Sequence, residues 1–199
     1  MIRAIRFPVP AALALVATAM LLALAPGRGE AGRPARAVDH LANLKLGHWI
    51  QIEGAARGTE PALCTDVRLL TGDFLDDDWS IEGTVQAVDV KKREIIISGV
   101  HVQVPENVSF ESSSKAFKGF LDIVPGMLLE VGGTYLRNRI FLAKEIDDES
   151  DDNERKPWGR DQILIVGKIE GVDSRKRLLS AMGFTFQVTE KTRLRSVIQ

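Results

Sequence analysis

Residues 81–110 read IEGTVQAVDVKKREIIISGVHVQVPENVSF, and residues 165–194 read IVGKIEGVDSRKRLLSAMGFTFQVTEKTRL. The two segments align without a gap at an offset of 84, and ten of the thirty aligned positions are identical. The identities include the turn residues Asp89/Asp173 and Gly99/Gly183 as well as apolar positions. Self-similarity at a fixed spacing is typical of a repeated structural unit. The chain is therefore predicted to contain such a unit more than once.

A second self-match pairs residues 36–67 with residues 115–146 at an offset of 79. Alternating apolar residues, which indicate a half-buried strand, coincide in both copies: His48/Ile50/Ile52 and Met127/Leu129/Val131. Upstream, an apolar residue at every third position indicates a short amphipathic helix in both copies: Val38/Leu41/Leu44 and Phe117/Phe120/Ile123. This fainter match places the second half of the same unit at the head of the chain.

The middle copy predicts a complete string of elements. Strands are expected over 83–88, 93–97 and 100–104, with a tight turn at Ser98-Gly99 because glycine accepts positive φ. A helix capped by the hydroxyls of 112–114 follows, and strands over 127–132 and 139–146 complete the unit. The order β-β-β-α-β-β is that of the five-stranded OB barrel. A flat meander with a helix across it has the same elements, but closure removes exposed edges and favours the barrel.

The flanking segments are complementary halves of this unit. Residues 163–199 carry the first three strands, and residues 36–73 carry a helix and the last two strands. We therefore expect an all-β protein with short helices, made of two small OB-like barrels: an intact one over 79–149, and a split one from 36–73 plus 163–199. Residues 150–162 form an acidic linker. The alternative is completion between molecules, as a domain-swapped oligomer or fibre.

The N-terminus has the pattern of an export signal. Arg3 and Arg6 precede an uncharged apolar run over 11–25, followed by small residues. The run is shorter than the roughly 20 residues that cross a bilayer. We expect a signal peptide over 1–31, cleaved to leave a periplasmic or secreted protein with no stable membrane span. An uncleaved N-terminal anchor is the weaker alternative.

Two stretches of the middle copy, GTVQAVDVKKREIIISGVHVQV (83–104) and VPGMLLEVGGTYLRNRIFLAKEI (124–146), resemble a bacterial family of domains of unknown function, numbered 5666. The motifs are a Gly-Thr-Val opening, an Asp…Arg turn and a Pro-Gly before the fourth strand. The resemblance implies small OB-like β-barrel repeats in exported proteins and no assigned activity. The tail has Gly167-Lys168-Ile169 where the motif has Gly-Thr-Val, and the head has Leu46-Gly47 where it has Pro-Gly.

The composition and motifs exclude several function classes. With 26 basic against 27 acidic residues, the chain lacks the excess of positive charge with which proteins bind nucleic acid. A single cysteine excludes a fold held together by disulfides. Ser112-Ser113-Ser114-Lys115 fits Ser-x-x-Lys, but a helix cap is favoured because the partner motifs are missing. The three histidines have no ligand spacing, and Cys64 is expected to be a buried thiol. We predict no catalytic residues, no metal site and no cofactor.

Two acidic runs, Asp73 with 76–78 and the run 147–154, flank the middle copy. Carboxylates at this density could hold Ca²⁺, but the second run lacks the glycine that an EF-hand loop needs. Solvated linkers are therefore favoured over a calcium site.

A candidate binding surface lies on the polar face of the third strand of each barrel, because OB barrels bind oligonucleotides or oligosaccharides over the second and third strands. The candidate residues are His101, Gln103, Thr185 and Gln187, with Trp49 as an exposed aromatic contact. The sequence therefore predicts an exported, non-enzymatic binding or protein-interaction module of the cell envelope, with an unknown protein or glycan partner. The alternatives are an oligosaccharide- or cation-binding module, and a hydrolase with an unrecognised site.

Overall fold

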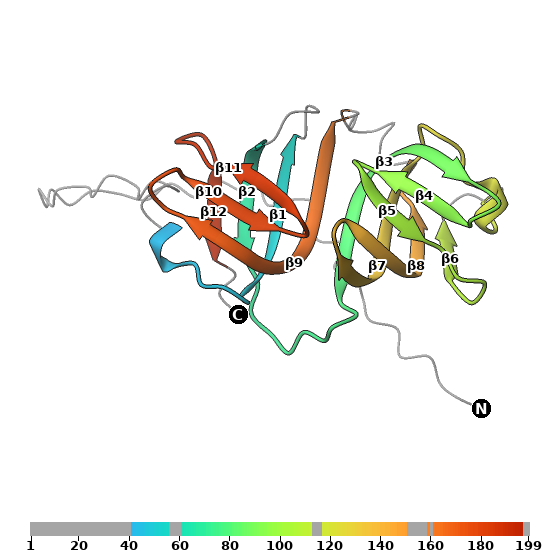
Figure 1. Cartoon of the computed structure of the whole chain (residues 1–199), viewed down its shortest axis with the longest axis horizontal. Coiled ribbons are helices and arrows are strands. Elements are labelled where there is room, and N and C mark those ends of the chain that lie inside the picture. Colours follow the sequence, from blue (N-terminus) through green and yellow to red (C-terminus); the bar gives the residue numbers. More distant parts are fainter. Residues whose placement is uncertain (1–40, 56–60, 113–116, 151–158, 160, 197–199) are drawn as a thin grey trace, which may run out of the picture. The chain divides into compact units, whose positions relative to one another are not determined.

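The computed structural model describes residues 41–55, 61–112, 117–150, 159 and 161–196 (Figure 1). In these residues the chain is mostly β, and its twelve strands belong to one sheet. The strands are β1 (Trp49–Ala55), β2 (Ala62–Leu69), β3 (Trp79–Asp89), β4 (Glu94–Ile97), β5 (Val100–Gln103), β6 (Ser109–Ser112), β7 (Leu128–Arg137), β8 (Ile140–Asp148), β9 (Gln162–Asp173), β10 (Leu178–Ala181), β11 (Phe184–Gln187) and β12 (Arg193–Ser196). The described residues also hold two 3₁₀ helices, η1 (Leu41–Asn43) and η2 (Phe120–Asp122). No helix among the described residues is long and apolar enough to span a membrane.

Five strands of the middle segment close into a barrel. β3 pairs with β4, β4 with β5, β5 with β8 in parallel, β8 with β7, and β7 returns to β3. We call this closed five-stranded barrel the middle ring. β6 adds in parallel to the far end of β8. Closure leaves none of the five strands with a free edge along its whole length, which removes a template for aggregation.

The strands at the head and the tail of the chain pair with one another. β1 pairs with β2 and with β9, β2 pairs in parallel with β11, and β10 lies between β11 and β9. We call β1, β2, β9, β10 and β11 the terminal ring. β12 adds in parallel to β2. Segments more than a hundred residues apart in sequence, such as 49–55 and 162–168, are thus direct neighbours.

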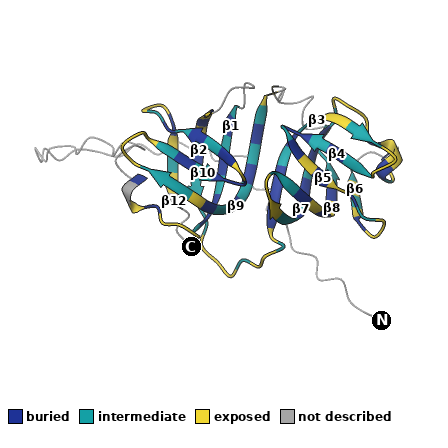
Figure 2. Cartoon of the chain, in the orientation of Figure 1, coloured by how far each residue is buried: buried dark blue, intermediate teal, exposed yellow. Residues whose placement is uncertain are grey.

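Buried residues alternate with more exposed ones along strands of both rings (Figure 2), and the buried ones are mostly apolar. A strand in a closed ring buries every second residue, so the period of two in the sequence becomes an inward-facing layer. In the middle ring these residues include Ile81, Ile95, Ile97, Val100, Val102, Leu129, Val131, Phe141 and Ala143. In the terminal ring they include Ile50, Ile52, Cys64, Val67, Ile163, Ile165, Leu179, Ala181, Phe184 and Phe186.

β3 and β9 join the two rings along a short antiparallel ladder, which we call the seam. Ser80, Ile81, Glu82 and Gly83 lie opposite Val166, Ile165, Leu164 and Ile163. A row of aromatic rings accompanies the seam: Trp49 stacks on Phe74 at 5.0 Å, Trp79 lies 5.2 Å from Trp49, and Tyr135 lies 5.3 Å from Trp79. Aromatic pairs at this spacing stabilise beyond the area they bury, by about 0.5–1.5 kcal/mol each.

The turns predicted from glycine and aspartate are present. Ser98 and Gly99 have φ values of 50° and 79°, and Met182 and Gly183 have 50° and 69°, the pattern of a two-residue hairpin turn with positive φ at both positions. Asp89 Oδ1 accepts a hydrogen bond from Lys92 N at 3.0 Å, and Asp173 Oδ1 accepts one from Lys176 N at 2.9 Å. These bonds close the turns that precede β4 and β10.

The helix expected after β5 differs from the prediction. Ser112 ends β6 instead of capping a helix, and its Oγ donates to Asp148 Oδ2 at 3.0 Å. Downstream, the described residues hold only the 3₁₀ turn η2, closed by bonds from Asp122 N to Gly119 O and from Ile123 N to Phe120 O. Phe117, Phe120 and Ile123 are all buried, which fits a helix of three residues per turn better than an α-helix. Gly119 before η2 and Pro125-Gly126 after it leave too few residues to repay the cost of nucleating an α-helix.

Other predicted boundaries also shift. β6 and β12 were not expected, because four residues with few apolar side chains give little periodicity. Asp147 and Asp148 belong to β8, so the second acidic run begins inside the barrel wall and not in a linker. The first run lies between β2 and β3, where Asp76 pairs with Lys168 at 2.8 Å and Asp77 pairs with Lys144. The predicted signal peptide and most of the predicted linker over 150–162 lie outside the described residues.

Candidate functional site

The turn between β7 and β8 has an unusual backbone. Arg137, Asn138 and Arg139 have φ values of 82°, 51° and 59°, three consecutive non-glycine residues in the left-handed region. Asparagine tolerates this region, but each arginine there costs roughly 1 kcal/mol or more. Such strain persists only where surrounding contacts enforce it, and it concentrates at binding and catalytic sites.

Arg139 supplies those contacts. Its backbone N donates to Tyr135 Oη at 3.2 Å, and its carbonyl accepts from His101 N at 2.8 Å. The side chain crosses to the terminal ring, where Nε donates to Gly183 O at 3.2 Å and the guanidinium lies 4.4 Å above the ring of Phe184. Arg139 therefore fixes the β7–β8 turn of the middle ring against the β10–β11 turn of the terminal ring.

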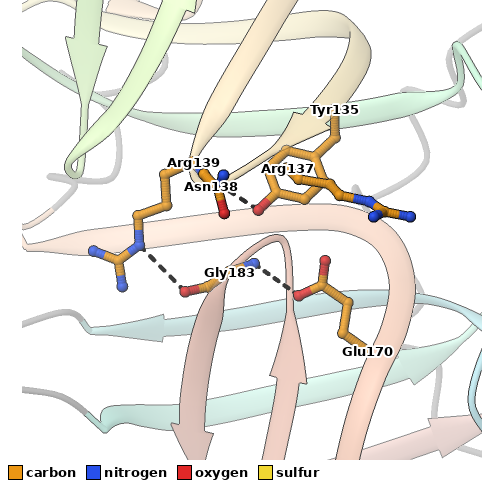
Figure 3. Close-up of a pocket in the computed structure, with 6 residues that line it drawn as sticks. All are labelled: Tyr135, Arg137, Asn138, Arg139, Glu170 and Gly183. Atoms are coloured by element: carbon orange, nitrogen blue, oxygen red, sulfur yellow. Dashed lines mark hydrogen bonds between the residues drawn. The ribbon is translucent and has the colours of Figure 1, made fainter.

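An open pocket of about 550 Å³ lies between these two turns (Figure 3). Six residues line it, and we call it the seam pocket: Tyr135, Arg137, Asn138, Arg139, Glu170 and Gly183. Five of the six carry a polar side chain, and two of those are arginines. In Figure 3 the guanidinium of Arg139 lies on one side of Gly183 and the carboxylate of Glu170 on the other. The pocket thus offers fixed hydrogen-bond donors and a carboxylate acceptor in one hollow.

Glu170 closes the β10–β11 turn through a hydrogen bond that a neutral side chain could also accept. Its Oε2 accepts from Gly183 N at 2.8 Å. At the aligned position of the middle ring, Gln86 Oε1 accepts from Gly99 N at 3.0 Å. The same turn is therefore closed by a neutral amide in one segment and by a carboxylate in the other. The negative charge of Glu170 is an addition specific to the seam pocket.

Tyr135 forms the aromatic wall of the pocket and remains a neutral phenol. Burial raises the pKa of its hydroxyl, the hydrogen bond from Arg139 N opposes this, and the charge of Glu170 raises the pKa further. The ring continues the aromatic row of the seam through Trp79. The half-buried hydroxyl is therefore an oriented polar group and not a base at neutral pH.

The residues predicted on the third strands lie on two separate strands. His101 and Gln103 are exposed on β5, and His101 Nδ1 lies 3.0 Å from Glu94 Oε1 on β4. Thr185 and Gln187 lie on β11 of the terminal ring. Gln187 Nε2 donates to the carbonyls of Lys176, Arg177 and Val188, so its side chain fastens the turn between β9 and β10. A binding role for these four residues stays a prediction.

Trp49 is not the exposed contact that its alternation with Ile50 predicted. Only 9% of the residue is exposed. Phe74 and Trp79 cover its ring, and Lys168 Nζ lies 5.3 Å from the ring centre. The outward face of β1 is covered by the seam, which alternation within one strand does not reveal.

A row of carboxylates crosses the outer face of the middle ring. Cross-strand register places Asp147 of β8 opposite Glu111 of β6 and opposite Glu130 of β7. Oxygens of Glu111, Glu145 and Asp147 lie within 4.8 Å of one another. Burial and the neighbouring carboxylates, first Glu145, raise the pKa of Asp147 to about 7, and burial raises the pKa of Glu130. Like charges directly opposite on a sheet repel, so this row costs stability at neutral pH.

Cys64 is buried, as expected, on the inner face of β2. Burial and the nearby Asp66 raise the pKa of its thiol to about 12. A thiol this far from ionisation is a poor nucleophile at neutral pH.

No strong signal for the seam pocket is present in the sequence. Arg139 is the first residue of the strand predicted over 139–146, and Arg137 lies between the two predicted strands, where Asn138 between two arginines is a turn signal. Gly183 is identified from the sequence only as a repeat position, and no sequence pattern singles out Glu170. The proximity of these residues depends on the pairing of β3 with β9, which no local pattern specifies.

Comparison with known proteins supports the family resemblance of the middle segment. Residues 82–147 match a family described as "Domain of unknown function (DUF5666)". This range runs from β3 into β8 and so includes the strands of the middle ring. No curated protein and no solved structure matches the chain.

Proposed function

We propose that this chain, whose middle segment carries the DUF5666 domain, is an exported, non-enzymatic module of two OB-like barrels that binds an oligosaccharide in the seam pocket. The single observation that carries the proposal is the pocket between Arg139 and Glu170. Different observations support the other parts of the proposal: the strand boundaries support two barrels, the pocket chemistry supports the ligand class, and the predicted export signal supports the location.

Strand boundaries support the two-barrel layout. β10, β11 and β12 begin and end 84 residues after β4, β5 and β6. The pairings agree as well, because β6 and β5 join β8 in parallel while β12 and β11 join β2 in parallel. Across the seam Ile81 lies opposite Ile165, its own aligned residue. A ladder centred on equivalent residues is what a two-fold relation between two copies of one unit produces.

The chemistry of the pocket favours an oligosaccharide as the ligand. Arginine, asparagine and glutamate side chains bind hydroxyl groups, and the ring of Tyr135 offers an apolar surface for the C–H face of a sugar. OB barrels are known to bind oligosaccharides. The balanced charge of the chain, with 26 basic and 27 acidic residues, argues against the other common OB ligand, nucleic acid.

Binding without catalysis is the function that the contacts support. Arg139, Tyr135 and Glu170 each hold a backbone group of a turn, which fixes the shape of the pocket. The six lining residues include no serine, cysteine or histidine that could act as a nucleophile or shared base. The export signal predicted over 1–31 supports a location in the cell envelope or outside the cell.

Two experiments test the proposal. Fractionation with mass spectrometry of the N-terminus should find the chain outside the cytoplasm with a start near residue 32; a cytoplasmic chain beginning at Met1 would contradict export. A calorimetric screen of neutral and acidic oligosaccharides should find at least one that binds the exported chain. Failure of every oligosaccharide to bind would reject the proposed function. Loss of binding in a His101→Ala/Gln103→Ala variant, with no loss in pocket variants, would move the site to β5.

A further inference from the structure

We infer that the ligand of the seam pocket is an acidic oligosaccharide, with its uronate carboxylate bound by Arg137 and neighbouring hydroxyls bound by Glu170. The inference rests on the proposed function and narrows it to one class of sugar. It assigns different roles to the two arginines of the β7–β8 turn.

Arg137 is the arginine placed to bind an anion. Arg139 is committed to Gly183 O and to the ring of Phe184, so its guanidinium forms part of the wall. Arg137 is exposed at the end of β7, and its side chain lines the same pocket. A guanidinium binds a carboxylate through two parallel hydrogen bonds, which gives both affinity and orientation. The backbone of Arg137 is held in the left-handed region, with φ at 82°.

Glu170 supplies acceptors for hydroxyl groups. An ionised carboxylate has about four acceptor positions. The bond from Gly183 N occupies one of them. Since Gln86 closes the equivalent turn without a charge, the carboxylate is not required for the fold of the hairpin. Charged acceptors bind hydroxyl donors about twice as strongly as neutral ones.

Arg137 and Glu170 carry opposite charges, and in Figure 3 the guanidinium and the carboxylate both lie on the side of Gly183 away from the Arg139 guanidinium. The carboxylate of a ligand is attracted to Arg137 and repelled by Glu170, which favours a pose in which that carboxylate contacts the guanidinium. Hydroxyl groups of the same or the next sugar then lie toward Glu170. Asn138, between the two arginines in sequence, adds both a donor and an acceptor for a hydroxyl group. A fully neutral sugar satisfies Glu170 but leaves the Arg137 guanidinium without an anionic partner.

The test uses calorimetry on the exported chain with trimers of galacturonic, glucuronic and mannuronic acid. Each binding trimer is compared with its methyl ester, which keeps the shape of the sugar and removes the charge. We expect at least one acid trimer to bind about tenfold more tightly than its ester, and the difference to shrink as salt is raised. Equal binding of acid and ester, or binding of neutral sugars alone, would overturn the inference while leaving the proposed function standing. Failure of every sugar to bind would reject both.

Variants separate the two roles. Arg137→Gln should weaken binding of the acid trimer about tenfold and leave binding of the ester unchanged, and Arg137→Lys should fall between. Glu170→Gln reproduces the side chain found at position 86, so it keeps the bond to Gly183 N and should weaken acid and ester binding alike by a few-fold. Arg175→Ala removes an exposed arginine outside the pocket and serves as the control, with binding unchanged. An equal loss in Arg137→Gln and Arg175→Ala would show a general charge effect and overturn the assignment.

Discussion

Ile81 of β3 and Ile165 of β9 lie directly opposite each other across the seam, although they occupy aligned positions of the two self-matching segments, 84 residues apart. Both side chains are fully buried. The seam therefore joins two equivalent strand segments through their own equivalent residues. This pairing brings the turn at Arg139 against the turn at Gly183 and so creates the pocket.

The first prediction concerns the packing of the seam. A Cβ on Gly167 would lie 2.5 Å from Trp79 Cε3, a distance that real Cβ contacts do not reach. Gly167→Ala must displace the indole and its aromatic neighbours, and overpacking of this kind costs about 1–3 kcal/mol. Urea unfolding followed by tryptophan fluorescence should show the loss. Gly171→Ala is the matched control, because its Cβ would meet Ser180 at an ordinary 3.5 Å. Equal stability of the two variants would contradict the seam as described.

The second prediction concerns pH. The pKa of Asp147 rises from 3.8 to about 7 in the folded chain, because burial and neighbouring carboxylates disfavour its charge. Between these two values the folded state binds more protons than the unfolded state, so stability should fall as pH rises and then level off above about 7. The lowered pKa values of Asp77 and Asp89 act in the opposite sense, but only as pH falls toward their folded values, below 3.8.

Asp147→Asn should reduce this pH dependence and leave the part that comes from Glu130, whose pKa is also raised by burial. It should also stabilise the protein at pH 8 by about 0.5–1 kcal/mol, the cost of like charges facing each other on a sheet. Thermal unfolding at pH 5 and pH 8 measures both effects. Glu106→Gln removes an exposed carboxylate outside the row formed by Glu111, Glu130, Glu145 and Asp147. It should change neither the pH dependence of stability nor the stability at pH 8. A variant at 147 that keeps the full pH dependence would show that other groups cause it.

The third prediction concerns Cys64. Its buried thiol, with a pKa raised to about 12, should not react with a disulfide reagent in the native protein and should react fully in urea. A disulfide reagent that releases a coloured thiolate on reaction measures the reactivity of Cys64, with and without urea. Rapid labelling of the native chain would mean that β2 opens easily or that the thiol is exposed.

Local signals predicted local structure. The Gly99 and Gly183 turns, the Asp89 and Asp173 turns and the buried alternation of β4, β5, β10 and β11 follow from residues close together in sequence. The pattern of Phe117, Phe120 and Ile123 predicted burial correctly but the wrong helix type, since spacing by three fits both. Gly119 and Pro125-Gly126, at the two ends of that segment, make it too short for an α-helix and favour the 3₁₀ turn.

Contacts between the two rings could not be predicted. Trp49 was expected outside because alternation describes only the two faces of its own strand. Its outer face is covered by Phe74 of the loop between β2 and β3 and by Trp79 of β3. The seam pocket depends in the same way on β3 meeting β9. Strand-edge pairing is made by backbone groups, and these are alike in every residue.

The pairing of head and tail within one polypeptide is the claim on which the terminal ring and the seam pocket both depend. Gln51 of β1 and Val166 of β9 are register partners. Opposed residues in an antiparallel pair have Cα atoms about 4.5–5.5 Å apart, within the range that a disulfide spans. A Gln51→Cys/Val166→Cys variant in a Cys64→Ala background should oxidise to a disulfide-bonded monomer, seen by non-reducing electrophoresis of dilute protein. A disulfide-linked dimer under the same conditions would show that the head of one chain completes the tail of another.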